Sequence, residues 1–462
     1  MRRACSAGGH AALTWSRCGP CGRPRARPPA CCRRTRPPDH RLPRAPRSPH
    51  GLHGLSIGPP RALHRASTAP PPALRTVAPM RILFTTIAAA AHFHPTVPLA
   101  WALRAAGHEV RVACEPGFTA TVTQSGLPAL AVGQDVDLRT FWQGHDLGPR
   151  EDMTAKEHQR LRLTRAIGMF SGIAAAAADD LIAFAESWRP DLVVFEARAY
   201  AGLIAARRLG VPAVRHLWGL DTTYGRRDFD GPFLEELWSR YGLAGVDPLG
   251  DLTVAPCPPS LAEPGELPRK HIRYVPYNGP GVMPSWLLRP VERPRVCVTW
   301  GHMFAQRTGT LHGLEMAVAA LRRLPVEVVA AITPSQRALL GEVPPGVRVV
   351  ESMPLNLLLP TCDAVVNGGG AGTMMTALAS AVPMIMVPSH ADEYHYAERL
   401  GGAGAAVSVD YRQADAAAIE RAAATVLGDP AYGTAAIRLR GESALLPTPG
   451  DLVADLEKLA VA

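Results

Sequence analysis

The chain has 462 residues, the length of two or three domains, and 47% of them are hydrophobic. No apolar run approaches the roughly 18 residues that a membrane span needs, so a transmembrane protein is excluded. The net charge of +9 would suit a nucleic-acid-binding protein. Residues 1–79, however, hold 15 Arg, no Lys and one acidic residue, so the remaining 383 residues carry a net charge of −5 and form no basic platform for nucleic acid.

Residues 1–79 form an Arg- and Pro-rich segment with 15 of the 45 prolines and five of the nine cysteines. The segment shows no period of a strand or helix, which predicts a disordered extension. A transit peptide is the alternative, since the segment is rich in Arg and poor in acids. The four other cysteines, Cys114, Cys257, Cys297 and Cys362, lack metal-ligand spacing and indicate a reduced, cytoplasmic protein.

From Met80 onward, short apolar strands alternate with helical patterns. Strands are predicted at 81–87, 110–115 and 191–196, with helices between them and a long helix over 154–188. Residues 133–157 lack periodicity and suit a substrate-binding loop. Residues 220–288 are rich in Pro and Gly and predict only short elements.

A second alternating series begins at 295 and continues to the C-terminus. Strand–helix alternation predicts βαβ units and parallel sheets, hence an α/β fold of two Rossmann-like domains that face a cleft. We expect a first domain at 80–280, a linker at 281–294 and a second domain at 295–462, with the last helix packing back on the first domain. Ligands bind beyond the carboxyl ends of such strands, so the chemistry is expected at the cleft.

A glycine-rich turn stands in the second domain, in the stretch "VVNGGGAGTMMTALA". The apolar run predicts a strand, and a helix is expected to begin near Thr373. Glycines let the backbone approach a ligand, and the free N–H groups and dipole of the first helical turn favour an anion such as phosphate. The alternative is a tight turn with close helix packing.

Two long segments carry a resemblance to a known family. "MPLNLLLPTCDAVVNGGGAGTMMTALASAVPMIMVPSHADEYHYAERL" resembles the donor-binding signature of the GT-B glycosyltransferases of antibiotic biosynthesis. "MRILFTTIAAAAHFHPTVPLAWALRAAGHEVRVACEP" is similar to the amino-terminal half of that family, and "IRYVPYNGP" to its interdomain linker. The resemblance extends from Met80 to the C-terminus.

The resemblance implies an activity. Family members transfer a deoxysugar from a nucleoside diphosphate, usually thymidine diphosphate (TDP), to a polyketide or other hydrophobic aglycone, usually with inversion and without a metal. The sugar nucleotide is a co-substrate, and no cofactor is implied. Donor and aglycone are the expected partners, and the resemblance also allows an auxiliary activator protein and a homodimer.

The resemblance places the donor diphosphate at the glycine turn, with two departures from the family pattern. The family uses a His where this chain has Gly368, and Asn367 precedes it where a second His is common. After Gly301, where relatives have Thr or Ser, this chain has His302, and our hypothesis is that His302 supplies the missing imidazole. The alternative is a solvated loop histidine. The residues that match the family loop are Gly369, Gly370, Ala371, Gly372 and Thr373.

The donor's sugar and base are expected to contact two further segments. Asp392 matches the acid of the family's Asp-Gln pair for sugar hydroxyls, whereas Glu393 replaces the Gln. A carboxylate accepts hydrogen bonds or pairs with an amino group but cannot donate, which indicates an altered donor such as an aminosugar. An exposed loop acid is the alternative. By analogy with the family, the nucleobase pocket is assigned to Ser352, Met353, Pro354 and Leu355.

The chemistry needs a base, because the acceptor hydroxyl loses a proton as it attacks the anomeric carbon. His92, after the first strand, occupies the family position of the catalytic histidine, and His94 is its rival. Glu196 ends a buried strand at the family position of the acid that fixes the base's tautomer. We therefore expect His92 and Glu196 to be the catalytic pair.

Three other functions share this signature. A nucleotide-sugar epimerase would need no acceptor loop, which disfavours it. A catalytically impaired homologue that acts as a binding or auxiliary protein fits the loss of the diphosphate histidine. A C-glycosyltransferase would use an activated carbon as nucleophile, and the sequence does not separate it from an O-glycosyltransferase. We favour an inverting, metal-independent glycosyltransferase of the cytoplasm.

Overall fold

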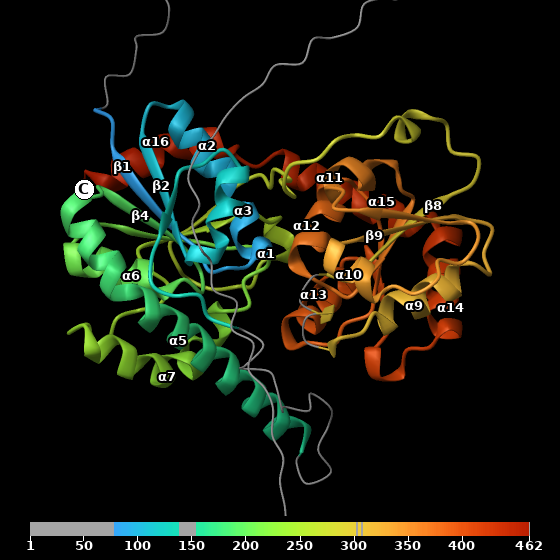
Figure 1. Cartoon of the computed structure of the whole chain (residues 1–462), viewed down its shortest axis with the longest axis horizontal. Helices are drawn as coiled ribbons and strands as arrows, with labels where there is room; N and C mark the ends of the chain where they lie inside the picture. Colours follow the sequence, from blue (N-terminus) through green and yellow to red (C-terminus); the bar gives the residue numbers. More distant parts are fainter. Residues whose placement is uncertain (1–77, 138–153, 302–303, 306–307, 462) are drawn as a thin grey trace, which may run out of the picture. The chain divides into compact units, whose positions relative to one another are not determined.

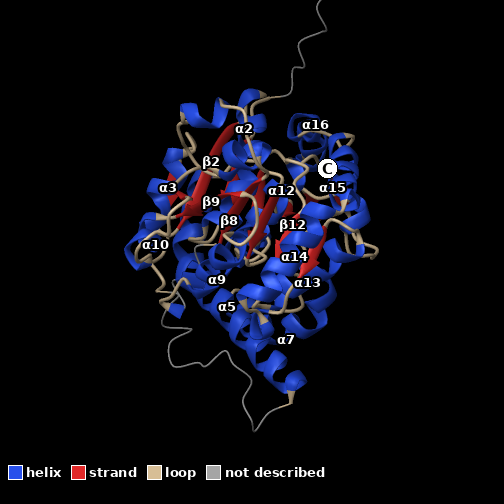
Figure 2. Ribbon diagram, turned by 90° about the vertical axis from the view of Figure 1, so that its right-hand side faces the viewer, coloured by secondary structure: helices blue, strands red, loops and turns tan. Residues whose placement is uncertain are grey.

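The structure is a computed structural model that describes residues 78–137, 154–301, 304–305 and 308–461. The predicted extension at 1–79, apart from its last two residues, lies outside the described part. So do residues 138–153, which make up most of the predicted substrate-binding loop. The described residues form two parallel sheets, one in each half of the sequence (Figure 1). Helices flank the strands (Figure 2), so the prediction of an α/β fold with two Rossmann-like halves is confirmed.

The first sheet has seven strands in the order β3-β2-β1-β4-β5-β6-β7, and every neighbouring pair is parallel. Its strands are β1 Arg81–Thr85, β2 Glu109–Cys114, β3 Ala129–Ala131, β4 Leu192–Glu196, β5 Ala213–His216, β6 Leu252–Ala255 and β7 Arg269–His271. Its helices are α1 Ala90–Phe93, α2 Val97–Ala105, α3 Thr119–Gln124, α5 Ala155–Trp188, α6 Tyr200–Leu209 and α7 Arg227–Arg240.

Both faces of the first sheet are buried, which is why its strands read as continuous apolar runs. In β4, Leu192 and Val194 pack in one core with α2 and α3, while Val193 and Phe195 pack in another with α5, α6 and α7. Successive strand residues point to opposite faces, so a single run such as "LVVF" serves both cores.

The long helix α5 begins where the sequence predicts. Thr154 and Glu157 form a capping box: the Thr154 hydroxyl accepts from the Glu157 N–H at 3.2 Å, and the Glu157 carboxylate accepts from the Thr154 N–H at 2.8 Å. By length and composition alone, 160–188 could cross a membrane. Its buried side chains, such as Leu181, pack against α6 and α7, which is the behaviour of a core helix.

The Pro- and Gly-rich stretch 220–288 is more regular than predicted. It contains the 14-residue helix α7 and the strands β6 and β7, which complete the first sheet. The prediction of only short elements was wrong because Gly231 and Pro232 lie within α7. Pro232 is at the sixth position of the helix, and buried Leu234, Leu237 and Trp238 hold the following turns against the core.

The second sheet has six parallel strands in the order β10-β9-β8-β11-β12-β13. They are β8 Arg295–Thr299, β9 Glu327–Ile332, β10 Val347–Glu351, β11 Ala364–Asn367, β12 Met384–Met386 and β13 Ala406–Ser408. The helices are α9 His312–Leu321, α10 Pro334–Leu339, α11 Leu355–Leu358, α12 Ala371–Ala379, α13 Ala391–Gly402, α14 Ala416–Gly428, α15 Pro430–Ala444 and α16 Pro449–Ala460. Helix α12 begins two residues earlier than predicted.

The last helix, α16, joins the core of the first half. Leu452, Val453 and Leu456 are buried in one cluster with Leu99 and Leu103 of α2, which lies beside α16 in Figure 1. The two halves also share a core between the sheets, in which residues after β5 pack with residues of α12.

Candidate active site

A histidine–carboxylate pair lies at the carboxyl ends of β1 and β4, which are neighbours in the first sheet. Nδ1 of His92 is 3.0 Å from Oε1 of Glu196. The Glu196 side chain is fully buried, whereas 18% of the His92 side chain is exposed. Glu196 Oε1 accepts a hydrogen bond from the N–H of Arg198 at 3.2 Å. His92 lies in the short helix α1 rather than in an open loop, and α1 contacts α12 of the second half.

Two aromatic rings surround the His92 imidazole. The indole of Trp218 is stacked on it, with ring centroids 4.3 Å apart and an interplanar angle of 26°. Phe170 of α5 is tilted against it at 6.4 Å. Neither residue was predicted from the sequence, although Trp218 is the second residue after β5 and so lies at the carboxyl edge of the sheet.

His94, the rival base, occupies a different environment. Its ring meets the edge of Tyr277 at 5.1 Å. Burial lowers the pKa of His94 to about 4, so the imidazole is neutral and only weakly basic near pH 7. His92 alone of the two contacts a carboxylate.

The glycine turn is held by the asparagine that precedes it. Oδ1 of Asn367, the last residue of β11, accepts from the Gly369 N–H at 2.7 Å. Gly369 has φ +90°, and a Cβ there would lie 2.9 Å from Cβ of Glu393. Gly370 is the N-cap of α12 and offers no side chain to the first helical turn. The backbone N–H groups at this helix start carry no side-chain cap, which is compatible with the predicted anion site. The Asn367 Nδ2 group is buried without a hydrogen-bond partner among the described residues.

The expected sugar-binding acids lie at the start of α13, beside the glycine turn. Oε2 of Glu393 accepts from the N–H groups of Ser389 at 2.7 Å and His390 at 2.9 Å. Burial opposes ionisation of Glu393, but these donors and the His390 side chain outweigh it and lower its pKa. The hydrogen bonds that Glu393 makes with other described residues all involve Oε2. Asp392 is next to Glu393, and Arg162 of α5 donates to the Ser389 carbonyl at 3.2 Å.

The segment predicted to line a nucleobase pocket follows β10. Ser352 has φ +53°, and its N–H donates to the Ile332 carbonyl at 2.9 Å. Leu355 begins α11, whose Asn356 N–H donates to Oδ1 of Asn278 at 3.0 Å. Asn278 Nδ2 in turn donates to the Thr376 hydroxyl of α12 at 3.1 Å. The remaining predicted pocket residues, Met353 and Pro354, lie within this segment, which is thus tied to the linker and to the anion helix.

The His92–Glu196 pair and the start of α12 approach each other through Gly219. A Cβ at Gly219 would lie only 3.2 Å from Cβ of Ala371, the first residue of α12. The carboxyl edge of the first sheet, with His92 and Glu196, therefore adjoins the amino end of α12.

Comparison with known proteins identifies the family. Residues 101–301 match the model of the erythromycin biosynthesis protein CIII-like N-terminal domain, and residues 315–459 match that of the C-terminal domain. The chain belongs to the erythromycin biosynthesis protein CIII-like family. It is a glycosyltransferase of GT-B fold, as the resemblance implied.

Similar proteins share the whole architecture of this CIII-like chain. Over 82% of this chain, the aclacinomycin-T 2-deoxy-L-fucose transferase of Streptomyces galilaeus is 37% identical, and 96% of that protein is covered. Over the same share, the 10-deoxymethynolide desosaminyltransferase of Streptomyces venezuelae is 38% identical, and 97% of it is covered. The solved spinosyn rhamnosyltransferase SpnG in complex with thymidine diphosphate is 34% identical, with a TM-score of 0.72, and the match covers 82% of this chain and all of SpnG.

Where the family pattern has a histidine, Gly368 of this CIII-like chain lies against a buried indole. A Cβ at Gly368 would lie 3.3 Å from Nε1 of Trp300, whose side chain also covers Gly313 so closely that a Cβ there would be 2.2 Å from the ring. The carbonyl of Gly301 accepts from Gln336 Nε2 at 2.8 Å. His302 lies outside the described residues, so its compensation for Gly368 stays a prediction. Within the described part, no three His, Cys, Asp or Glu side chains gather to hold a metal ion.

Proposed function

We propose that this CIII-like glycosyltransferase moves a deoxysugar from TDP to a hydroxyl group of a hydrophobic natural-product aglycone, with inversion at the anomeric carbon. The observation that carries the proposal is the 3.0 Å contact between His92 Nδ1 and the buried carboxylate of Glu196. A buried carboxylate next to a partly exposed imidazole fits a general base better than a structural ion pair.

In the proposed reaction, Glu196 holds the proton of His92 on Nδ1, which leaves the lone pair of Nε2 free. Nε2 takes the proton of the acceptor hydroxyl as the oxygen attacks the anomeric carbon. The carboxylate then stabilises the imidazolium that forms. The leaving diphosphate departs from the opposite face of the sugar, so a single displacement inverts the configuration.

The start of α12 would receive the donor diphosphate. Its N–H groups and the positive end of its dipole favour the charge that develops on the leaving group, and we propose that no metal ion is needed for this step. The thymidine nucleotide is proposed because SpnG and the glycosyltransferase VinC have both been solved with thymidine diphosphate. The deoxysugar is proposed because the similar transferases carry deoxy or aminodeoxy sugars in their names. Oε1 of Glu393 would meet a hydroxyl or an amino group of the sugar.

Calorimetric titration of the full chain with TDP and uridine diphosphate tests the donor. We expect micromolar binding of TDP and weaker binding of the uridine nucleotide. Equal affinity for both would contradict the proposed base selectivity.

Substitution of the pair tests the chemistry. We expect His92→Gln to lower kcat by about 10²–10⁴-fold, the usual contribution of a general base, and Glu196→Gln to lower it by a smaller factor. His94→Gln is the matched control, because His94 is a neighbouring histidine without a carboxylate partner, and it should retain most activity. Product formation from TDP-deoxysugars with macrolactone and anthracyclinone aglycones is followed by mass spectrometry. Transfer at the wild-type rate by His92→Gln would refute the proposed base.

One observation favours the second candidate, a catalytically impaired homologue that serves as a binding protein. Trp300 covers the place from which a family histidine at Gly368 would reach the diphosphate. Failure of the folded chain to bind TDP, together with lack of transfer, would establish this alternative. Binding of TDP with micromolar affinity would show that other groups have replaced the histidine.

A further inference from the structure

The loop Leu217–Tyr224, which follows β5, connects the base to the donor-binding half. Trp218 is stacked on His92, and the next residue, Gly219, lies against Ala371 at the first residue of α12. Trp218 also neighbours Tyr396 of α13: burial raises the pKa of the Tyr396 hydroxyl well above its usual value, and the nearby Trp218 and Thr222 side chains oppose this shift. The loop is thus the backbone link between the two parts of the site.

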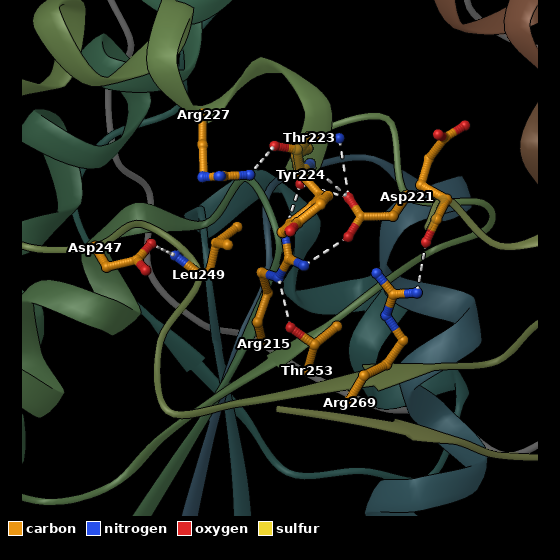
Figure 3. A network of polar contacts seen from close by, with 10 residues as sticks. Arg215, Asp221, Thr223, Tyr224, Arg227, Asp247, Leu249, Thr253 and Arg269 are labelled. Carbon is orange, nitrogen blue, oxygen red and sulfur yellow. Dashed lines mark hydrogen bonds and ion pairs between the residues drawn. The ribbon is translucent and has the colours of Figure 1, made fainter. Parts of the chain in front are cut away.

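A buried ion pair anchors this loop (Figure 3). Nη2 of Arg215, on β5, donates to Oδ2 of Asp221 at 2.6 Å. The Arg215 side chain is 0% exposed and that of Asp221 is 3% exposed. The other two nitrogens of the guanidinium donate to the hydroxyls of Thr223 at 2.5 Å and Thr253 at 3.1 Å. All three guanidinium nitrogens are therefore used inside the protein.

Asp221 in turn fixes the far end of the loop. Its Oδ1 accepts from the Thr223 N–H at 2.9 Å, the Thr223 hydroxyl at 2.7 Å and the Tyr224 N–H at 3.0 Å. Burial raises the pKa of an acid, but Arg215 and these donors outweigh it, and the pKa of Asp221 is lowered. At the near end, Nδ1 of His216 is 2.8 Å from the Leu217 carbonyl. Trp218 is thus held from both sides along the chain.

A buried ion pair of this kind is not explained by folding stability alone. Removing two charges from water is repaid only when geometry and further hydrogen bonds are complete, and apolar residues often serve equally well. An imidazole, moreover, rotates about two bonds. The Glu196 contact fixes the direction of Nδ1, whereas the face of the indole fixes the plane of the ring. Both are needed to aim Nε2, and an aromatic face also favours the imidazolium that forms after proton transfer.

We propose that Trp218 is a positioning residue for His92, and that the Arg215–Asp221 ion pair acts through Trp218 to align the base with the donor helix. This inference rests on the proposed function of His92 and adds a residue and an ion pair that act on the reaction through His92. Loss of Trp218 or of the ion pair should misplace the base, which lowers kcat by about 10²-fold with little change in donor KM.

The tautomer of His92 provides a test that needs no acceptor. The full chain is labelled with 15N in its histidines, and ring nitrogens are observed near pH 8.5, with the His92 signals assigned by their loss in His92→Gln. In the wild type we expect the proton on Nδ1. Trp218→Leu and Asp221→Asn should let the ring turn out of the plane in which Nδ1 meets Glu196. Both ring nitrogen shifts should then move toward the average of the two tautomers. Trp218→Phe, which keeps an aromatic face, should retain the wild-type shifts.

Glu327→Gln is the matched control. Glu327 pairs with buried Arg295 at 3.0 Å at the opposite, amino end of the second sheet, so this variant weakens a buried Arg–acid pair without touching the loop. Unchanged His92 shifts in both Trp218→Leu and Asp221→Asn would overturn the inference, as would equal changes in Glu327→Gln. If Asp221→Asn fails to fold, Trp218→Leu still decides. Full transfer by His92→Gln would instead refute the proposed function, whatever the tautomer.

Discussion

His216, on β5 beside the active-site strand β4, provides a quantitative test of burial in this fold. Its side chain is buried, and Nδ1 lies 2.8 Å from the Leu217 carbonyl, a separation at which Nδ1 carries the proton and donates. Burial lowers the pKa of His216 from 6.5 to about 4. The folded protein therefore keeps this imidazole neutral at pH values where the unfolded chain binds a proton.

The sign of the effect follows from proton linkage. The unfolded state binds more protons between pH 6.5 and 4, so stability falls as the pH falls through this window and is fully present above it. For these two pKa values, lowering the pH from 7.5 to 4.5 removes about 2–3 kcal/mol of folding free energy through His216 alone. His94 is shifted by the same cause and adds its own loss.

His216→Asn isolates this contribution, because an asparagine amide can donate to the Leu217 carbonyl but does not titrate. Urea unfolding is followed by tryptophan fluorescence for both proteins at the two pH values. We expect the loss of unfolding free energy between pH 7.5 and 4.5 to be about 2–3 kcal/mol smaller in the variant than in the wild type. His94 is present in both proteins and cancels. An equal loss in both proteins would refute the assignment of His216 as a buried neutral group.

Three further predictions concern the donor site. Gly369→Ala should destabilise the fold by about 1–3 kcal/mol in urea unfolding, because Gly369 has a φ of +90° and a Cβ there would contact Glu393. Gly370→Ala is the control and should change the free energy of unfolding little, because Gly370 has a φ of −62° and open space around it. Similar losses in both variants would argue against backbone strain. Gly368→His alone should not raise TDP affinity in calorimetry, whereas Gly368→His combined with Trp300→Leu should, since the indole fills the space next to Gly368. Dialysis against EDTA should leave the transfer rate unchanged, and a loss restored by Mg²⁺ would contradict metal independence.

Much of the architecture could be predicted because both faces of each sheet are buried. The apolar runs at β1, β4, β8 and β11 and the capping residue of α5 are local signals, and the structure confirms them. Helix α7 could not be predicted from local signals, since Gly231 and Pro232 oppose a helix and only tertiary packing of the following turns overrides them.

The candidate site also has a part that could be predicted from the sequence and a part that could not. His92 lies in the short helix that follows β1, and Glu196 ends β4, so the parallel pairing of β1 and β4 brings them together at the carboxyl edge of the sheet. Trp218 depends on the conformation of the loop after β5, which Arg215 sets through a contact six positions away. The role of Trp300 beside Gly368 depends on packing between β8 and the glycine turn. Neither contact leaves a periodic or spaced pattern in the sequence.

Because α16 packs on the first half, it constrains the order in which the protein can fold during translation. The first sheet is complete with β7, which ends at His271, but the helix that covers α2 begins 178 positions later, at Pro449. At ordinary rates of translation, this delay is about 10–35 s. During this delay, Leu99 and Leu103 of the growing chain lack the contacts that α16 makes with them in the folded protein. A ribosome-bound first half should therefore be a client of chaperones, and the two halves should become stable together, only when the last helix is released.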